Sequence, residues 1–358
     1  MPPMTTHQRM TRMLAHQEAD RVPITDGPWG STLERWRREG LPPDVHFADY
    51  FDLDRFPSIG ADNSPRYPQR TVEETDEWVV RTTAWGATIK SWKHHGGVPE
   101  FLDFTIRDRD SWEQAKARMT PDRDRVNWDH LRAHYAQWRS KGYWISASFW
   151  FGFDVTHSWA VGTQRVLEAM VDDPQWLVDI FNHYLDVDIA LFEQIWNAGY
   201  TFDEIRWPDD MGYKGHQFFS RAMYHDLLKP VHKRAADWAH ARGVKVALHS
   251  CGDVRPLIDE LIDIGIDLLN PIEVKAGMDP VTLKRQYGDR LAFHGGINAA
   301  LYGESDKLQA HMRAVIPQMK HNGGYVISSD HSVPDSVSLE DFRRFVELAR
   351  ELGSYERG

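Results

Sequence analysis

Residues 244–254, VKVALHSCGDV, combine an apolar strand, a tight turn and the start of a helix. The first seven residues are largely apolar and rich in valine, which is typical of a strand buried in a parallel sheet. Gly252 permits a sharp turn, and Asp253 is placed to cap a helix that begins near Arg255. The stretch therefore predicts one βα unit, with His249 and Cys251 at the end of its strand.

The same alternation recurs from about residue 140 onward. Amphipathic segments such as 165–199 repeat apolar residues at helical intervals, namely Leu167, Met170, Val171, Leu177, Ile180, Phe181 and Leu185. The candidate strands are 143–149, 202–207, 244–250, 266–272, 290–296 and 324–330. Two further candidates, 21–25 and the weaker 51–56, bring the number close to eight. Repeated βα units of this kind predict an α/β fold, a (β/α)8 TIM barrel.

Residues 57–125 have a different pattern. The segment EWVVRTTAWGATIKSW, residues 77–92, is typical of two strands joined at Ala84, Trp85 and Gly86 in an antiparallel hairpin. We expect this region to be an insertion in the barrel. The chain has no Pro/Gly-rich linker and no clear internal repeat, which favours a single domain over residues 1–358.

The composition restricts the class of protein. Of 358 residues, 41% are hydrophobic and 27% charged, and no apolar run approaches the ~18 residues of a membrane span. No secretory signal is recognisable, and a single cysteine cannot form an internal disulfide. We therefore expect a cytoplasmic protein that does not bind membranes. A net charge of −11 without basic blocks argues against nucleic acid as a partner.

Polar side chains gather at the predicted strand ends. In a TIM barrel these ends form the mouth where substrates bind, so their concentration indicates an enzyme acting on a small molecule. The substrate-binding candidates are Asp26, Trp29, Phe153, Asn270 and His294. The candidate catalytic residues, able to orient the substrate or supply a proton, are Asp210, Glu273 and His331.

The lone cysteine is a candidate metal ligand. Residues i and i+2 of a strand point to the same side, so His249 and Cys251 can present nitrogen and sulfur to one ion. Catalytic zinc takes three protein ligands and keeps one position open. Candidates for the third ligand are Asp330, His331 and Glu273, and Asp330 is the one predicted. The alternatives for Cys251 are an inert buried thiol, or a nucleophile activated by His249, which this geometry disfavours.

Three segments resemble the uroporphyrinogen decarboxylase superfamily, which includes the decarboxylase and cobalamin-linked methyltransferases. They are HSCGDVRPLIDELIDIGIDLLNPIE (249–273), LAFHGGIN (291–298) and GGYVISSDHSVPDSVSLEDFRRFVELARE (323–351). The resemblance implies a (β/α)8 barrel with its active site in the mouth. It also implies that His331 corresponds to the family histidine near the last strand.

The resemblance favours the methyltransferase branch over the decarboxylase. The decarboxylase holds porphyrinogen carboxylates with arginines after its first strand, whereas Arg35, Arg37 and Arg38 of this chain have a different arrangement. The methyltransferases begin a zinc site with a His-x-Cys pair like His249 and Cys251. They complete it with a second cysteine near the last strand, where this chain has SSDHS, residues 328–332.

One thiolate instead of two leaves zinc harder and better suited to polarising an ether oxygen. We therefore predict a zinc-dependent O-demethylase that moves a methyl group from a methoxylated small molecule to a corrinoid (cobalamin) on a partner protein. The alternative is a metal-independent decarboxylase of a polycarboxylate, in which Asp210 and His331 handle protons and Cys251 only packs. A third possibility is a binding module without turnover.

Overall fold

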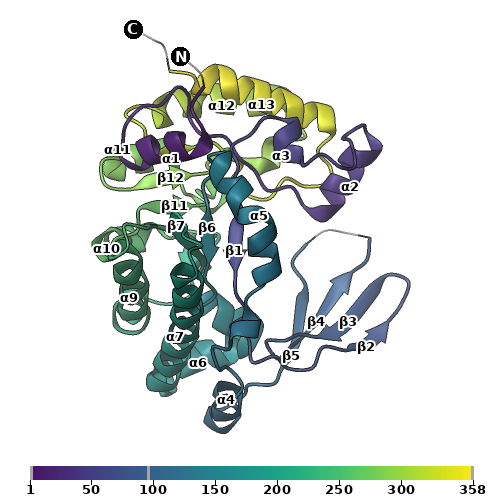
Figure 1. Ribbon diagram of the computed structural model, residues 1–358, viewed down its shortest axis with the longest axis vertical. Coiled ribbons are helices and arrows are strands. Elements are labelled where there is room, and N and C mark those ends of the chain that lie inside the picture. Colours follow the sequence, from purple (N-terminus) through teal and green to yellow (C-terminus); the bar gives the residue numbers. More distant parts are fainter. Residues whose placement is uncertain (1–2, 95–96, 356–358) are drawn as a thin grey trace.

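The computed structural model describes residues 3–94 and 97–355, and its centre is a parallel sheet (Figure 1). Seven strands pair in the order β1-β6-β7-β10-β11-β12-β13. Their bounds are β1 (Ser58–Gly60), β6 (Ser146–Ser148), β7 (Glu204–Pro208), β10 (Lys245–His249), β11 (Leu268–Asn270), β12 (Ala292–His294) and β13 (Tyr325–Val326). Parallel neighbours need long crossover connections, and helices supply most of them. The fold is therefore a mixed α/β fold around a parallel sheet.

Six of the predicted strands, from 143–149 to 324–330, are confirmed as β6, β7 and β10 to β13. The segment 21–25 pairs with the chain after β13 through one parallel bridge, Ile24 to Ile327. The prediction of a strand at 51–56 is wrong. The chain there leaves helix α3 (Phe47–Tyr50) through a turn in which Asp52 has a φ of 49°, and the strand begins only at Ser58.

The helices surround the sheet, with α6, α7 and α9 on one side of it and α12 and α13 beside the chain ends in Figure 1. Besides α3 they are α1 (Thr6–Leu14), α2 (Gly30–Arg38), α4 (Arg109–Lys116), α5 (Trp128–Ser140), α6 (Thr163–Asp172), α7 (Pro174–Asn197), α8 (Arg221–Met223), α9 (Lys229–His240), α10 (Ile258–Ile264), α11 (Pro280–Tyr287), α12 (Ser305–Met319) and α13 (Leu339–Gly353). The segment 165–199 forms two helices, because Pro174 lacks an amide hydrogen and starts a new helix.

A second sheet is antiparallel and lies apart from the first in Figure 1. It contains β2 (Thr71–Glu74), β3 (Trp78–Thr82), β4 (Ala87–Trp92) and β5 (Glu100–Phe104). β3 and β4 occupy the segment where we expected a hairpin, and they pair antiparallel. β1 lies within the range 57–125 but belongs to the central sheet, so the antiparallel addition begins only at Thr71. A short pair, β8 (Gly212–Tyr213) and β9 (His216–Gln217), follows β7.

The core has two parts. The larger one fills the space between the central sheet and the helices. In the smaller one, α1 packs Met10, Met13 and Leu14 against the face of the central sheet opposite to the larger core, at Trp144, Ala247, Leu268, Ala292 and Val326. Helix α1 therefore covers the end of the strands opposite to their carboxyl ends.

The first and last described segments of the chain lie together, as Figure 1 shows, and an antiparallel bridge joins Arg21 to Ser354. Among the described residues, none of the helices combines the length and the apolar character needed to cross a bilayer.

Candidate active site

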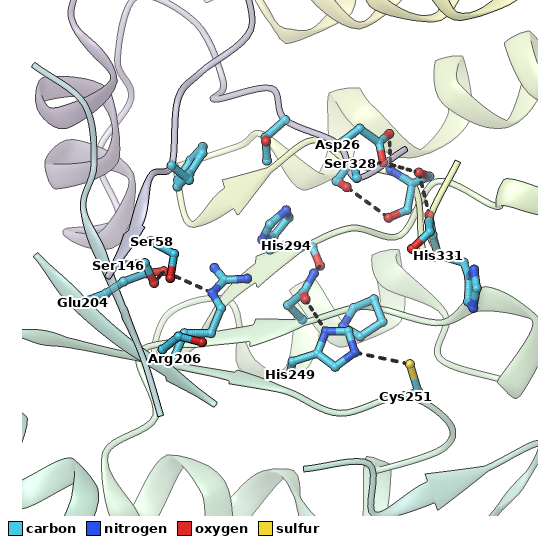
Figure 2. Close-up of a pocket in the computed structure, with 18 residues that line it drawn as sticks. Asp26, Ser58, Ser146, Glu204, Arg206, His249, Cys251, His294, Ser328 and His331 are labelled. Carbon is cyan, nitrogen blue, oxygen red and sulfur yellow. Dashed lines mark hydrogen bonds and ion pairs between the residues drawn. The ribbon is translucent and has the colours of Figure 1, made fainter. Parts of the chain in front are cut away.

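A cavity of about 380 Å³ opens among the carboxyl ends of the central strands and extends along the face of the sheet that α1 covers at its other end (Figure 2). Its volume is at the lower end of the range for sites that bind small molecules. The lining residues are Thr25, Asp26, Gly27, Phe56, Ser58, Ser146, Ser148, Glu204, Arg206, His249, Cys251, Asn270, Pro271, His294, Ser328, Ser329, His331 and Ser332. The cavity thus has the position where an enzyme of this architecture holds its substrate.

Small side chains on the inward face of the strands create this space. TIM-barrel interiors are normally filled by bulky branched residues. Here the inward positions of β6 are Ser146 and Ser148, and β10 and β12 contribute Ala247 and Ala292 below the cavity. This face of the sheet is packed at the end covered by α1, and the half nearer the carboxyl ends of the strands is open for a ligand.

His249 and Cys251 of the cavity wall form a group of three potential metal ligands with Asp210, which does not itself line the cavity. One ligand atom from each lies within 4.8 Å of the others. The Nε2 atom of His249 is 3.4 Å from the sulfur of Cys251 and 3.8 Å from Oδ1 of Asp210. Ligands of tetrahedral zinc stand about 3.4–3.6 Å apart at usual bond lengths, so the two separations from His249 are close to those around such an ion.

Asn270 sets the orientation of the His249 ring. Its amide nitrogen donates to the carbonyl oxygen of His294 at 3.2 Å, so its oxygen faces Nδ1 of His249 at 2.6 Å. His249 therefore carries its proton on Nδ1, and the lone pair of Nε2 points toward Cys251. Partners of this kind fix the tautomer of histidines that bind metals.

The backbone around Cys251 is held by carboxylates. The amide of Cys251 donates to Oδ1 of Asp210 at 2.7 Å, and the amide of Gly252 donates to Glu273 at 2.6 Å. Burial, together with these two carboxylates, raises the pKa of the Cys251 thiol above its usual range. In the absence of a cation the sulfur is therefore protonated, and a bound metal ion would displace that proton.

Asp330 does not join this group, which corrects the predicted ligand set of His249, Cys251 and Asp330. Its two oxygens accept the backbone amides of Val274 at 2.9 Å and Ala299 at 2.8 Å, and the residue is only 1% exposed. Asp330 therefore ties two loops together, and the carboxylate beside His249 and Cys251 comes from Asp210.

The other two candidate catalytic residues differ in position. His331 lines the cavity, as does Cys251, and its ring lies edge-on to Trp29 at 6.0 Å. Glu273 is 8% exposed and is engaged by Gly252 and by Lys275, at 3.3 Å. His331 is therefore placed to meet a ligand, whereas Glu273 supports the loop that carries Cys251.

Of the substrate-binding candidates, Asp26, Asn270 and His294 line the cavity, whereas Trp29 and Phe153 do not. Phe153 is fully buried, 4.5 Å from the ring of His157 and 4.8 Å from that of Phe219, because its side chain points into the core. Trp29 precedes α2 and reaches the site only through its contact with His331.

Asp26 holds the last strand beside the cavity. Its carboxylate accepts the hydroxyl of Ser329 at 2.6 Å, the amide of Ser329 at 3.1 Å and the amide of Gly27 at 2.9 Å. Burial nevertheless raises the pKa of Asp26 to about 6, because these hydrogen bonds only partly offset the desolvation of its charge.

The sequence reasoning missed Arg206 and Glu204 on β7, which line the inner part of the cavity. The rule that functional residues lie at strand ends does not identify Glu204 and Arg206, because both lie before the end of β7. The alternation along β7 was the available signal. Ile205 and Trp207 face the larger core, so Glu204 and Arg206, which alternate with them, must face the opposite side of the sheet, where the cavity lies.

Two aspartates next to the site have structural roles. Asp209 is fully buried, and its carboxylate lies 2.7 Å from Nε2 of His232. Of the adjacent residues Asp209 and Asp210, only Asp210 therefore belongs to the metal-ligand group. Asp253 accepts the amide of Arg255 at 3.1 Å and binds its guanidinium at 2.7 Å. The expected cap is not found, because the helical turn Arg255–Leu257 has Val254 as its N-cap without a side-chain hydrogen bond, and Asp253 stabilises the turn before it.

Comparisons with known proteins agree with this architecture. A methyltransferase from Methanosarcina mazei has a similar structure, with a TM-score of 0.66, 16% sequence identity, and 97% of this chain and 99% of that chain covered. At this identity the similarity concerns the fold alone. A uroporphyrinogen decarboxylase from Arthrobacter sp. (strain FB24) is 25% identical over 178 residues, which is 49% of this chain and 47% of that protein. This chain thus matches about half the length of that curated relative.

The family comparison covers the segment that carries the metal-ligand group and most of the cavity. The model of the family described as Uroporphyrinogen decarboxylase (URO-D) matches residues 156–352. These residues include β7, β10, β11, β12 and β13, and therefore Arg206, His249, Cys251 and His331. With more than half of its length matched, the chain belongs to the uroporphyrinogen decarboxylase family.

Proposed function

We propose that this protein is a zinc-dependent methyltransferase that removes the methyl group from a methoxylated small molecule and passes it to a corrinoid cofactor on a partner protein. One observation carries the proposal, namely the convergence of Asp210, His249 and Cys251 on a volume that suits one ion. The zinc ligands proposed are these three residues, and the fourth position is left for the substrate.

The donor set favours an oxygen substrate over a thiol. One sulfur, one imidazole and one carboxylate donate less charge than two thiolates and a histidine, so the ion stays a stronger Lewis acid. Bound zinc would supply that Lewis acidity to the oxygen from which the methyl group departs.

Three side chains near the proposed zinc ligands would have separate roles in the reaction. Asn270 keeps Nε2 of His249 directed at the ion, and Glu273 holds the loop of Cys251 in place. His331 lines the cavity near the same rim and would donate a proton to the leaving oxygen. The partner protein that carries the corrinoid would exclude water from the site.

The closure of the central sheet is a second part of the proposal. We propose that the central strands close into an eight-stranded barrel within a single domain. Ile24 pairs with Ile327 on one side, and on the other its amide donates to Oδ2 of Asp54 at 2.8 Å while its carbonyl accepts the amide of Asp54 at 2.9 Å. These contacts join the segment 21–25 to the residue that follows β13 and to a residue shortly before β1, the two edge strands of the seven-stranded sheet.

Metal analysis tests the proposal. We expect about one equivalent of zinc in the purified protein, and less than a tenth of that in His249→Ala or Cys251→Ser. Asp330→Asn is the matched control because it removes a carboxylate that lies outside the ligand group, and it should keep its zinc. A protein that turns over methoxylated substrates without metal would overturn the proposal.

The methyl acceptor needs a separate assay. Zinc-loaded protein should methylate free cob(I)alamin from a methoxylated donor, which absorbance spectroscopy detects. Release of CO₂ from a polycarboxylate without corrinoid would instead establish the decarboxylase suggested by the name of the Arthrobacter relative. The small cavity volume makes a tetrapyrrole with many carboxylates a poor fit.

A further inference from the structure

Arg206 projects into the cavity from the middle of β7, below the level of the metal-ligand group. In the register of β7 and β10, Arg206 stands opposite Ala247, and His249 stands opposite Pro208. Arg206 is thus two residues deeper in the ring than His249, about 7 Å along the strand. Figure 2 shows its guanidinium directed toward the side of the cavity where His294 lies.

The Nε atom of Arg206 is held by Glu204, whereas its two terminal guanidinium nitrogens are available to bind a ligand. Its Nε atom donates to Oε1 of Glu204 at 3.1 Å. Glu204 is 1% exposed, and its carboxylate also accepts the hydroxyl of Ser146 and the indole of Trp144, both at 2.9 Å. The two terminal nitrogens of Arg206 make no hydrogen bond to any of the residues that the structure describes, and the residue lines the cavity.

His294 adds a second polar group to the same wall. It is 7% exposed and lines the cavity, and its Nδ1 atom is buried without a hydrogen-bond partner among the described residues. Burial, Arg206 and His249 hold the pKa of His294 well below its usual range, so the ring is neutral and carries one N–H. The hydroxyls of Ser58 and Ser148 complete the polar surface around Arg206.

We propose that Arg206, His294 and the neighbouring serines form a subsite for a carboxylate on the substrate. The fork of an arginine binds a carboxylate through two parallel hydrogen bonds, and Glu204 aligns that fork with the open space. Resting on the proposed function, this assigns the substrate class as a small methoxylated carboxylic acid. Its anionic end lies deep in the ring, and its methoxy group reaches the rim beside His249 and Cys251.

The alternative is that Arg206 has only a structural role. In that reading Arg206 only neutralises the buried carboxylate of Glu204. Its loss would then destabilise the fold without changing which ligands bind. Ligand selectivity therefore separates the two readings, because only a carboxylate subsite makes the preference for an anionic ligand depend on Arg206.

The probe pair is 4-methoxybenzoate and its neutral analogue 4-methoxybenzamide, with affinities measured by calorimetry on zinc-loaded and zinc-free protein. We expect wild-type protein to bind the benzoate at least tenfold more tightly than the benzamide. Arg206→Gln should abolish this preference, whereas Arg206→Lys, which keeps the charge, should retain part of it. Arg344→Gln, an exposed arginine on α13 with ion pairs of its own, is the control that should change nothing.

The outcomes separate this inference from the proposed function. If Cys251→Ser loses zinc but keeps the preference for the benzoate, the carboxylate binds at Arg206 and not at the metal. An unchanged preference in a folded Arg206→Gln protein would overturn the subsite, even with zinc still bound. A preference lost in Cys251→Ser and kept in Arg206→Gln would also overturn it, because the carboxylate would then be a metal ligand. A Cys251→Ser protein that keeps its zinc contradicts the proposed metal centre alone.

Discussion

Replacement of Asn270 by alanine tests the metal centre without removing a ligand. Asn270 is 9% exposed, accepts the Nδ1 proton of His249 at 2.6 Å and donates to the carbonyl of His294 at 3.2 Å. Alanine removes both bonds and lets the ring of His249 rotate. Loss of such a partner lowers metal affinity about 10- to 100-fold, which corresponds to about 1.4–2.7 kcal/mol of binding free energy. We therefore expect a zinc dissociation constant raised by that factor.

The measurement is a competition between the protein and a chromogenic chelator for zinc. Asn270→Asp keeps an acceptor for His249 but loses the donor to His294, so its affinity should stay within a few-fold of wild type. Its free energy of unfolding should fall by about 1–3 kcal/mol, because a buried carbonyl loses its partner. Asn197→Ala, an exposed residue at the end of α7, serves as a control that should alter neither quantity. Unchanged affinity in Asn270→Ala would refute the reasoning, since His249 would then need no orienting partner.

Two further predictions concern the interior of the ring. Met10→Ala, within the cluster that α1 forms with the inward-facing residues, should lower the free energy of unfolding in urea by about 2–5 kcal/mol and leave the zinc content unchanged; a loss below 1 kcal/mol would contradict this packing. Asp26, with its pKa raised from 3.8 to about 6, keeps its proton in the folded protein between these pH values, whereas the unfolded chain loses it. The stability contributed by Asp26 is therefore fully present below pH 3.8 and is lost as the pH rises through about 6. In urea unfolding, wild type should therefore lose stability relative to Asp26→Asn as the pH rises across this interval, and a difference that stays constant with pH would be inconsistent with the shift.

The sequence predicted the elements that local patterns determine. Apolar runs bounded by turns identified six central strands, and the polar residues at their ends included His249, Cys251, Asn270 and His331 of the cavity. The reason is physical: parallel strands end at one edge, so residues at their ends converge whatever the exact packing. This rule needs only the approximate end of each strand, which a single sequence supplies.

The errors concern side chains whose direction depends on loop geometry. Asp330 follows β13 by a few residues, but its loop turns the carboxylate onto backbone amides of two neighbouring loops, away from His249. Asp210 also lies beyond its strand, and it reaches the group by accepting the amide of Cys251. Phe153 was expected in the mouth, yet it points into an aromatic cluster. No sequence period specifies these directions, because turns do not continue the alternation of a strand.

The positions of Arg206 and the metal-ligand group place two different chemistries at two depths of one cavity. An arginine deep in a ring is costly unless a carboxylate compensates it, and Glu204 does so while leaving the fork of Arg206 open. The rim offers soft and hard donors together in Cys251 and Asp210. A ligand with one anionic end and one methoxy end can satisfy both in only one orientation. Under the proposed function, the order of small and charged residues along β6 and β7 would set which end of the substrate meets the metal, and changes at Arg206 should alter ligand selectivity without changing the zinc content.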